Sequence, residues 1–227
     1  MCIDPYFVTV DLSKSWDWRS DNFTSINAIP RPQDTTVAIP PSVMRSALYQ
    51  GATNDQFHLY GGTVFQGNIS FPNYTPPSDK PGSLWSYDVK KQAWSSSNIT
   101  AQSPIPPNHG AYADAPNLGL GFYLGGQLDR GSGGNIGLDG NSSTKVTGLI
   151  VVNTTSHSVF NVSIGNLDKP DRVGGSLLYV ANVGRKGVLV AIGGVAGYAR
   201  TDSSISGSPY RIVGPDGGGR VRCAPDT

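Results

Sequence analysis

The sequence contains little charge, and the charge that it has is balanced. Only 15% of the 227 residues are charged, against about 25% in average globular proteins. The 17 basic side chains nearly cancel the 16 acidic ones, and no run of lysine or arginine is present. A protein that follows a phosphate backbone needs such a basic run. We therefore expect no nucleic-acid partner.

Long apolar runs and cysteines are also scarce. The longest apolar run, residues 187–195, falls far short of the roughly 20 residues that cross a bilayer, so we expect no membrane span within this chain. Residues 1–4 lack the basic start and apolar run of a signal peptide. Cys2 and Cys223 stand at opposite ends of the chain. They could form one disulfide bond in an oxidising compartment, although their spacing does not establish it.

Motifs that carry common enzyme chemistry are absent as well. There is no G-x-S-x-G nucleophile elbow and no G-x-x-x-x-G-K-S/T phosphate loop. The three histidines, His58, His109 and His157, have no spacing typical of a zinc pair. We predict no catalytic residues, no cofactor and no metal, and therefore a protein that is not an enzyme.

Glycine and proline, by contrast, are plentiful, at 29 and 17 residues. This composition favours many short strands joined by turns. The strands repeat. An apolar segment that ends in two glycines occurs three times, and its copies lie 64 and then 68 residues apart. The three pairs are Gly61–Gly62, Gly125–Gly126 and Gly193–Gly194.

Further strands surround each glycine pair. Ala47 and Ala111, in the strands that precede the first two pairs, both lie 14 residues before their pair. Because a one-residue slip would turn every side chain to the other face of a sheet, this constant spacing indicates a shared register. After the first pair, a predicted hairpin carries Tyr87, Asp88 and Trp94. We expect the aromatic rings to pack between neighbouring sheets and the aspartate to set the turn.

The pattern resembles the kelch repeat of β-propellers: a strand that ends in Gly-Gly, a strand with Tyr87-Asp88, and Trp94 seven residues after that tyrosine. Residues 119–126 and 172–180 are also similar to blades of the secreted-side kelch ectodomains of fungal membrane proteins. In that family, the resemblance implies a signal peptide, a propeller, one transmembrane helix and a cytoplasmic tail.

We therefore predict an all-β fold, an incomplete kelch-type β-propeller with about three blades' worth of four-stranded sheets. Long insertions at residues 63–82 and 127–146 are candidates for partner contact or glycan display, since loops of this length are usually functional or mobile. The predicted parts are an outer strand pair at 1–20, full blades at 43–100 and 107–165, an inner strand pair at 170–200, and an irregular tail at 201–227.

N-glycosylation sequons take up seven of the 14 asparagines, where chance would supply about two or three. This excess predicts passage through the secretory pathway and an extracellular or cell-surface location. A surface that is merely rich in Ser, Thr and Asn is the alternative. The sequons begin at Asn22, Asn68, Asn73, Asn98, Asn141, Asn153 and Asn161.

Three side chains that precede the innermost strand of each predicted blade are candidate ligand contacts: Arg45, His109 and Arg172. Hydrogen bonding to adjacent backbone is the alternative role for them. The leading hypothesis is a non-catalytic module that binds a protein or a carbohydrate. One alternative is an enzyme resembling the copper-radical oxidases built on kelch propellers, although both cysteines here lie outside the repeats. Another is a truncated remnant without independent function.

Overall fold

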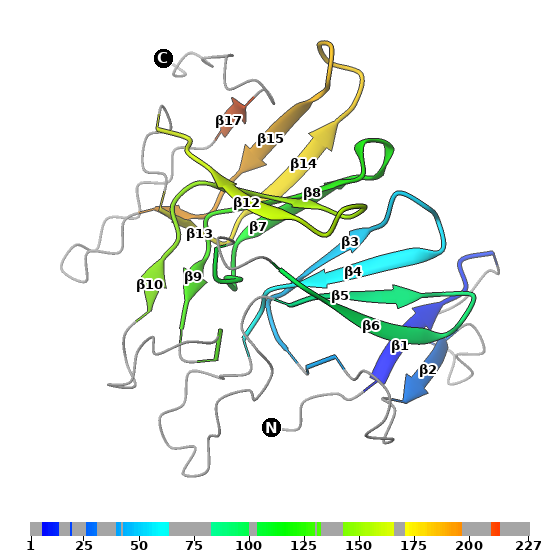
Figure 1. The fold of residues 1–227 in the computed structure, drawn as a ribbon. Helices are drawn as coiled ribbons and strands as arrows, with labels where there is room; N and C mark the ends of the chain where they lie inside the picture. Colours follow the sequence, from blue (N-terminus) through cyan, green and yellow to red (C-terminus); the bar gives the residue numbers. More distant parts are fainter. Residues whose placement is uncertain are drawn as a thin grey trace, which may run out of the picture.

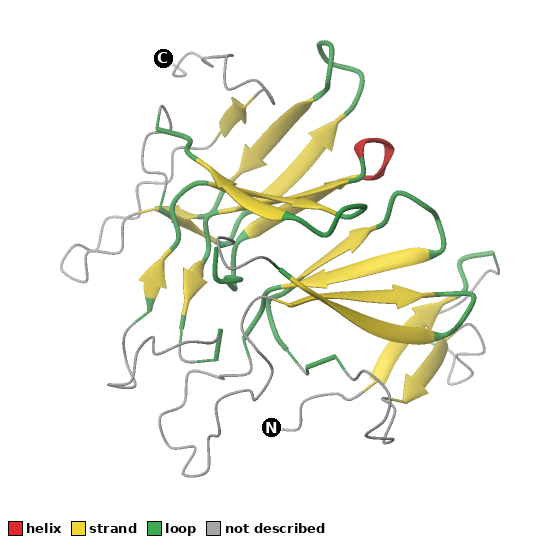
Figure 2. Ribbon diagram, viewed as in Figure 1, coloured by secondary structure: helices red, strands yellow, loops and turns green. Residues whose placement is uncertain are grey.

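The computed structural model describes residues 6–13, 19, 26–30, 40–41, 43–63, 83–99, 104–129, 131–132, 143–165, 171–196 and 210–213. Within these ranges the chain is made of strands and loops, with one short 3-10 turn, η1 (Pro116–Leu118) (Figure 2). The strands form several small antiparallel sheets that fan out from a common region (Figure 1). No helix in this described part is long and apolar enough to cross a membrane.

Two complete blades lie next to each other. Each is a four-stranded antiparallel sheet, and in each the sequence order of the strands is also their spatial order. The first blade contains β3 (Ala47–Gln50), β4 (Gln56–Tyr60), β5 (Ser83–Asp88) and β6 (Ala93–Asn98). The second blade contains β7 (Ala111–Ala115), β8 (Leu120–Leu124), β11 (Leu149–Asn153) and β12 (Val159–Val162).

The third blade has three described strands: β14 (Ser176–Val180), β15 (Val188–Ile192) and β17 (Tyr210–Val213). We predicted only the first two of these, and an irregular tail at 201–227. That prediction is wrong for β17, which pairs with β15. Tyr-Arg-Ile-Val is rich in strand-forming residues. We did not predict a strand there because the run is only four residues long and lies among glycine and serine. The other residues of the tail lie outside the described ranges.

At the N-terminus, β1 (Tyr6–Val10) pairs with β2 (Ile26–Pro30) in an antiparallel hairpin. We expected both strands of this pair within residues 1–20. The described partner of β1 instead comes later in the chain.

The core consists of two layers of side chains, one at each junction between blades. Tyr49 and Tyr60 of the first blade are fully buried against Tyr123 and Ile150 of the second. The hydroxyl of Tyr49 donates a hydrogen bond to the carbonyl oxygen of Phe122, 3.1 Å away. Between the second and third blades, Leu177, Leu189 and Ala191 pack into a second cluster. Face-to-face packing of neighbouring sheets is therefore what holds the arc together.

Candidate ligand-binding site

The glycine pairs are the joints at which one blade meets the next. All six glycines have positive φ angles, between 66° and 96°, which glycine adopts at little steric cost. A Cβ atom at Gly61 would collide with the carbonyl oxygen of Pro107, and one at Gly125 with that of Arg172. Gly61 and Gly125 therefore have to be glycine because of both their backbone conformation and the closeness of the next blade.

The residue two positions before each inner strand has the same left-handed backbone. Arg45, His109 and Gly174 have φ angles of 58°, 60° and 71°. The N–H of His109 donates to the carbonyl oxygen of Arg45 at 3.2 Å, and that of Gly174 donates to the carbonyl oxygen of His109 at 2.6 Å. A chain of main-chain hydrogen bonds thus passes from blade to blade through equivalent positions, near the centre of the arc.

This geometry corrects the alignment of the candidate residues. Gly174, and not Arg172, is equivalent to Arg45 and His109, while Arg172 is equivalent to Pro107, since both accept a hydrogen bond from the second glycine of a pair. The guanidinium of Arg172 donates to the carbonyl oxygen of Gly193 at 2.5 Å. For Arg172, the structure therefore has the adjacent-backbone role that we considered as the alternative.

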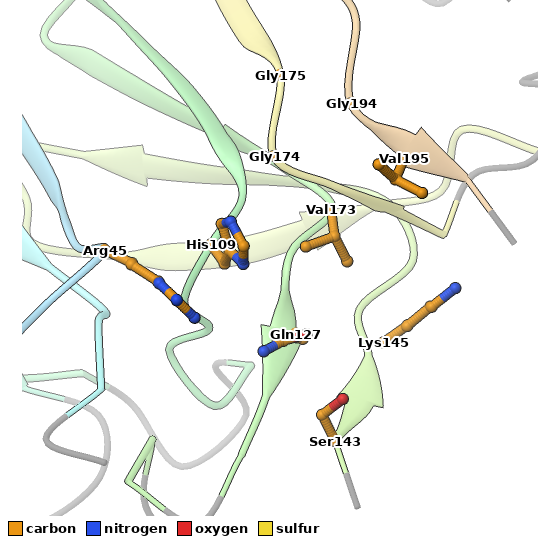
Figure 3. Close-up of a pocket in the computed structure, with 10 residues that line it drawn as sticks. All are labelled: Arg45, His109, Gln127, Ser143, Lys145, Val173, Gly174, Gly175, Gly194 and Val195. Carbon is orange, nitrogen blue, oxygen red and sulfur yellow. The ribbon is translucent and has the colours of Figure 1, made fainter. Parts of the chain in front are cut away.

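Arg45 and His109 line one pocket of about 770 Å³ (Figure 3). Lys145, on the short strand β10 (Thr144–Lys145), lies across from them in Figure 3. The other lining residues are two neutral polar residues, three glycines and two valines: Gln127, Ser143, Gly174, Gly175, Gly194, Val173 and Val195.

Basic groups dominate the polar chemistry of this pocket. Burial, and then the positive charge of Arg45, lower the pKa of His109, so the imidazole is neutral at neutral pH and can donate or accept a hydrogen bond. Lys145 Nζ lies 3.5 Å from Asp171 Oδ2, while the side chain of Arg45 is exposed. No aspartate or glutamate is among the described lining residues. An exposed guanidinium beside a neutral imidazole suits a carboxylate or another acidic group.

Our predicted ligand contacts did not include three of the lining residues, Lys145, Gln127 and Ser143. They belong to the insertion at residues 127–146, which its length alone had indicated as a candidate for partner contact. The two ends of that insertion pair with each other, since β9 (Gln127–Leu128) and β10 form a separate two-stranded sheet. No motif in the sequence specifies this pairing, so only the length of the loop could have indicated it.

The other kelch residues have structural roles. The rings of Tyr87 and Trp94 lie 5.1 Å apart, centroid to centroid. Asp88 Oδ1 accepts hydrogen bonds from the N–H groups of Lys90 and Lys91, each at 3.0 Å. Asn153 does the same for the turn of the second blade. These residues therefore shape the blades, and none of them is among the described residues that line the pocket.

Three of the seven sequons fall on described residues. Asn98 and Asn161 are exposed, and Asn153 is half-buried. The other four, together with Cys2 and Cys223, lie outside the described ranges. Among the described residues, no three His, Cys, Asp or Glu side chains gather closely enough to hold a metal ion.

Comparisons with known proteins agree with this architecture. No family model matches the chain. A kelch repeat-containing protein of Arthroderma benhamiae is 32% identical over 134 residues, which is 54% of this chain and 18% of the relative. The solved structure of YjhT, a kelch-type propeller, superposes with a TM-score of 0.52 at 14% identity, covering 86% of this chain and 46% of that one. The chain thus spans less than half the length of either protein. From its repeat, its blades and these two likenesses, we conclude that the chain carries kelch-type repeats and folds as a kelch-type β-propeller.

Proposed function

We propose that the chain is a non-catalytic binding module on the extracellular side, and that the pocket of Arg45 and His109 receives an acidic group of a protein or carbohydrate partner. The observation that carries the proposal is the convergence of these two side chains, from successive blades, on one pocket that Lys145 also lines. Two equivalent positions of a repeat thereby offer different polar groups to one ligand.

The described lining residues also argue against the copper-radical alternative. That chemistry needs two tyrosines, two histidines and a cysteine bonded to one of the tyrosines. Among the described residues of this pocket there is one histidine, His109, and there is no tyrosine or cysteine. The described part of the pocket therefore lacks the tyrosines, the second histidine and the cysteine that this reaction needs.

A binding screen with matched arginine variants tests the proposal. The protein, made in a secretory host, is applied to an array of neutral, sulfated and carboxylated glycans, and is used in parallel as bait for secreted proteins. We expect binding to acidic ligands that weakens at least about tenfold in Arg45→Gln, the loss of one charge-assisted hydrogen bond. Arg172→Gln is the control, because its guanidinium already bonds to Gly193. Equal binding by both variants, or selection of neutral ligands only, would contradict the proposed site.

The remaining alternative is a remnant that has no function of its own. Circular dichroism during heating distinguishes it from a folded module. A cooperative loss of the β signal supports the module, because small folded domains unfold in one transition. A gradual change without a transition supports the remnant.

A further inference from the structure

His109 has a strained backbone conformation at a position where the next blade has glycine. The φ angles of His109 and Arg45 are 60° and 58°, and the equivalent residue of the third blade is Gly174, at 71°. Such angles are uncommon for other residues than glycine, because the Cβ atom crowds the backbone. Among the described residues only Gln92 and His157 are further cases, and both lie in the turn of a hairpin. Strained residues outside such turns collect at functional sites.

The imidazole of His109 does not help to join the blades. The main-chain N–H and carbonyl oxygen of His109 form the hydrogen bonds to the neighbouring blades, whereas the ring makes no hydrogen bond within the described part of the chain. The ring lines the pocket instead, as does the exposed side chain of Arg45 (Figure 3). Glycine would keep both main-chain bonds, so histidine adds only a titratable ring in the pocket.

The charged groups around this ring are mostly basic. Burial, and then the positive charge of Arg45 on the first blade, lower the pKa of His109. Lys145, on β10, lines the same pocket and lies 3.5 Å from Asp171 Oδ2. The remaining described lining residues carry no charge. At neutral pH the pocket therefore contains a neutral imidazole and two cationic side chains, one of which faces a carboxylate.

We propose that His109 determines the pH response of this pocket, so that an acidic ligand binds more tightly once the imidazole is protonated. The inference rests on the proposed function, in which the pocket receives an acidic group. An anion beside the ring favours the imidazolium, so the pKa of His109 is higher in the complex than in the free protein. Affinity therefore rises as the pH falls through the higher pKa, and it levels off below the lower one, which lies under 6.5.

Binding of two acidic probes at two pH values tests the inference. The full chain, made in a secretory host, is titrated with a fluorescent hexaglutamate peptide and a fluorescent sulfated hexasaccharide at about pH 7.5 and about pH 5, on either side of the usual histidine pKa. Because a nearby opposite charge changes a pKa by about 1–3, we expect affinity to be at least about tenfold higher at the lower pH. The sulfated probe keeps its charge at both pH values, so its gain comes from the protein. His109→Gln should lose the gain, whereas Arg172→Gln, whose guanidinium bonds to Gly193, should keep it.

The possible results separate this inference from the proposed function. If Arg45→Gln weakens binding at the higher pH but the wild type binds equally at both pH values, the inference alone is overturned. A gain at the lower pH that persists in His109→Gln also overturns it, because other groups are then the cause. Absence of binding by either probe at both pH values overturns the inference and the proposed function together. Circular dichroism at each pH checks that every variant is folded.

Glycine at position 109 supplies a second test, because it removes the ring together with the backbone strain. We expect His109→Gly to raise the melting temperature by about 1–3 °C and to lose the gain in affinity at the lower pH. Gln92→Gly is the matched control, since Gln92 has a φ angle of 50°, is exposed and is not among the described lining residues. It should raise the melting temperature similarly and leave binding unchanged. A lower melting temperature in His109→Gly would assign the ring a role in the fold and overturn the inference.

Discussion

The N–H of Gly62 donates a hydrogen bond to the carbonyl oxygen of Pro107, 2.9 Å away, across the junction between the first and second blades. One repeat later, the N–H of Gly126 donates to the carbonyl oxygen of Arg172 at 2.6 Å. In each case the first glycine of the pair lies against the same carbonyl. The glycine pair of this repeat therefore does two things: it turns the chain after the second strand, and it joins one blade to the next.

Substitution of the first glycine should reveal the second of these roles. We expect Gly61→Ala and Gly125→Ala to lower the free energy of unfolding by about 1–2 kcal/mol for the left-handed backbone, and by about 1–3 kcal/mol more for the collision with the next blade. Gly184→Ala carries the backbone strain alone, because nothing lies within 4 Å of its Cβ position. Urea unfolding measures the difference. Equal losses in all three variants would mean that the blade contact adds no stability.

His58 makes the stability of the chain depend on pH. It is fully buried between the first two blades, its Nδ1 hydrogen-bonds to Ser86 Oγ at 2.9 Å, and its buried Nε2 has no partner. Burial, and then the neighbouring His157, lower the pKa of His58 from 6.5 to about 4. Because the folded state then binds fewer protons than the unfolded state, stability is complete above pH 6.5 and is lost as the pH falls toward 4. The shift corresponds to about 3 kcal/mol.

The second blade indicates how to remove this dependence. Phe122 and Val151 stand at the positions of His58 and Ser86, since the two strand pairs have the same register. We expect His58→Phe/Ser86→Val to flatten the dependence of the unfolding free energy on pH between 6.5 and 4, because no buried imidazole remains to be protonated. The measurement is urea unfolding at several pH values. His157→Gln is the control, since this side chain is only partly buried, and it should keep most of the slope. An unchanged slope in the double variant would assign the acid sensitivity to other groups.

The turn after the third strand offers a second local test. Hydrogen bonds from the backbone of Lys91, ahead of other contacts, hold the pKa of Asp88 below its usual value. Asp88→Ala removes the acceptor of both N–H bonds, and we expect the melting temperature to fall by a few degrees. Asp88→Asn should recover most of the loss, because Asn153 makes the same two bonds in the second blade. Calorimetry measures both variants, and an Asn variant as unstable as the Ala variant would contradict this role.

The parts of the molecule that could be predicted are those in which one residue type is required by its own backbone or turn. Gly61 and Gly125 need a left-handed backbone, and Asp88 and Asn153 bond to their own turns, so these positions show directly in the sequence. Arg172 was placed at the wrong position because its charge resembled that of Arg45, while the equivalent residue is the uncharged Gly174. Lys145 was missed because its place in the pocket depends on the pairing of β9 and β10 across a long loop, and long-range pairing leaves no local pattern.

Two sequons lie on equivalent outer strands, which gives the proposed secretory origin a structural test. Asn98 ends β6 and Asn161 lies within β12, and these are the outermost strands of the two complete blades. An outermost strand presents unpaired N–H and C=O groups that can bind another chain, and a glycan on that edge hinders such pairing.

In a secretory host we expect both asparagines to carry glycans, so that Asn98→Gln and Asn161→Gln each reduce the mass by one glycan, as mass spectrometry measures. The double variant should also aggregate faster on heating, as followed by light scattering. Asn182→Gln, an exposed asparagine outside any sequon, is the control and should change neither. An unglycosylated product would remove this support for an extracellular module, because the proposed location rests on the use of these sequons as glycosylation sites.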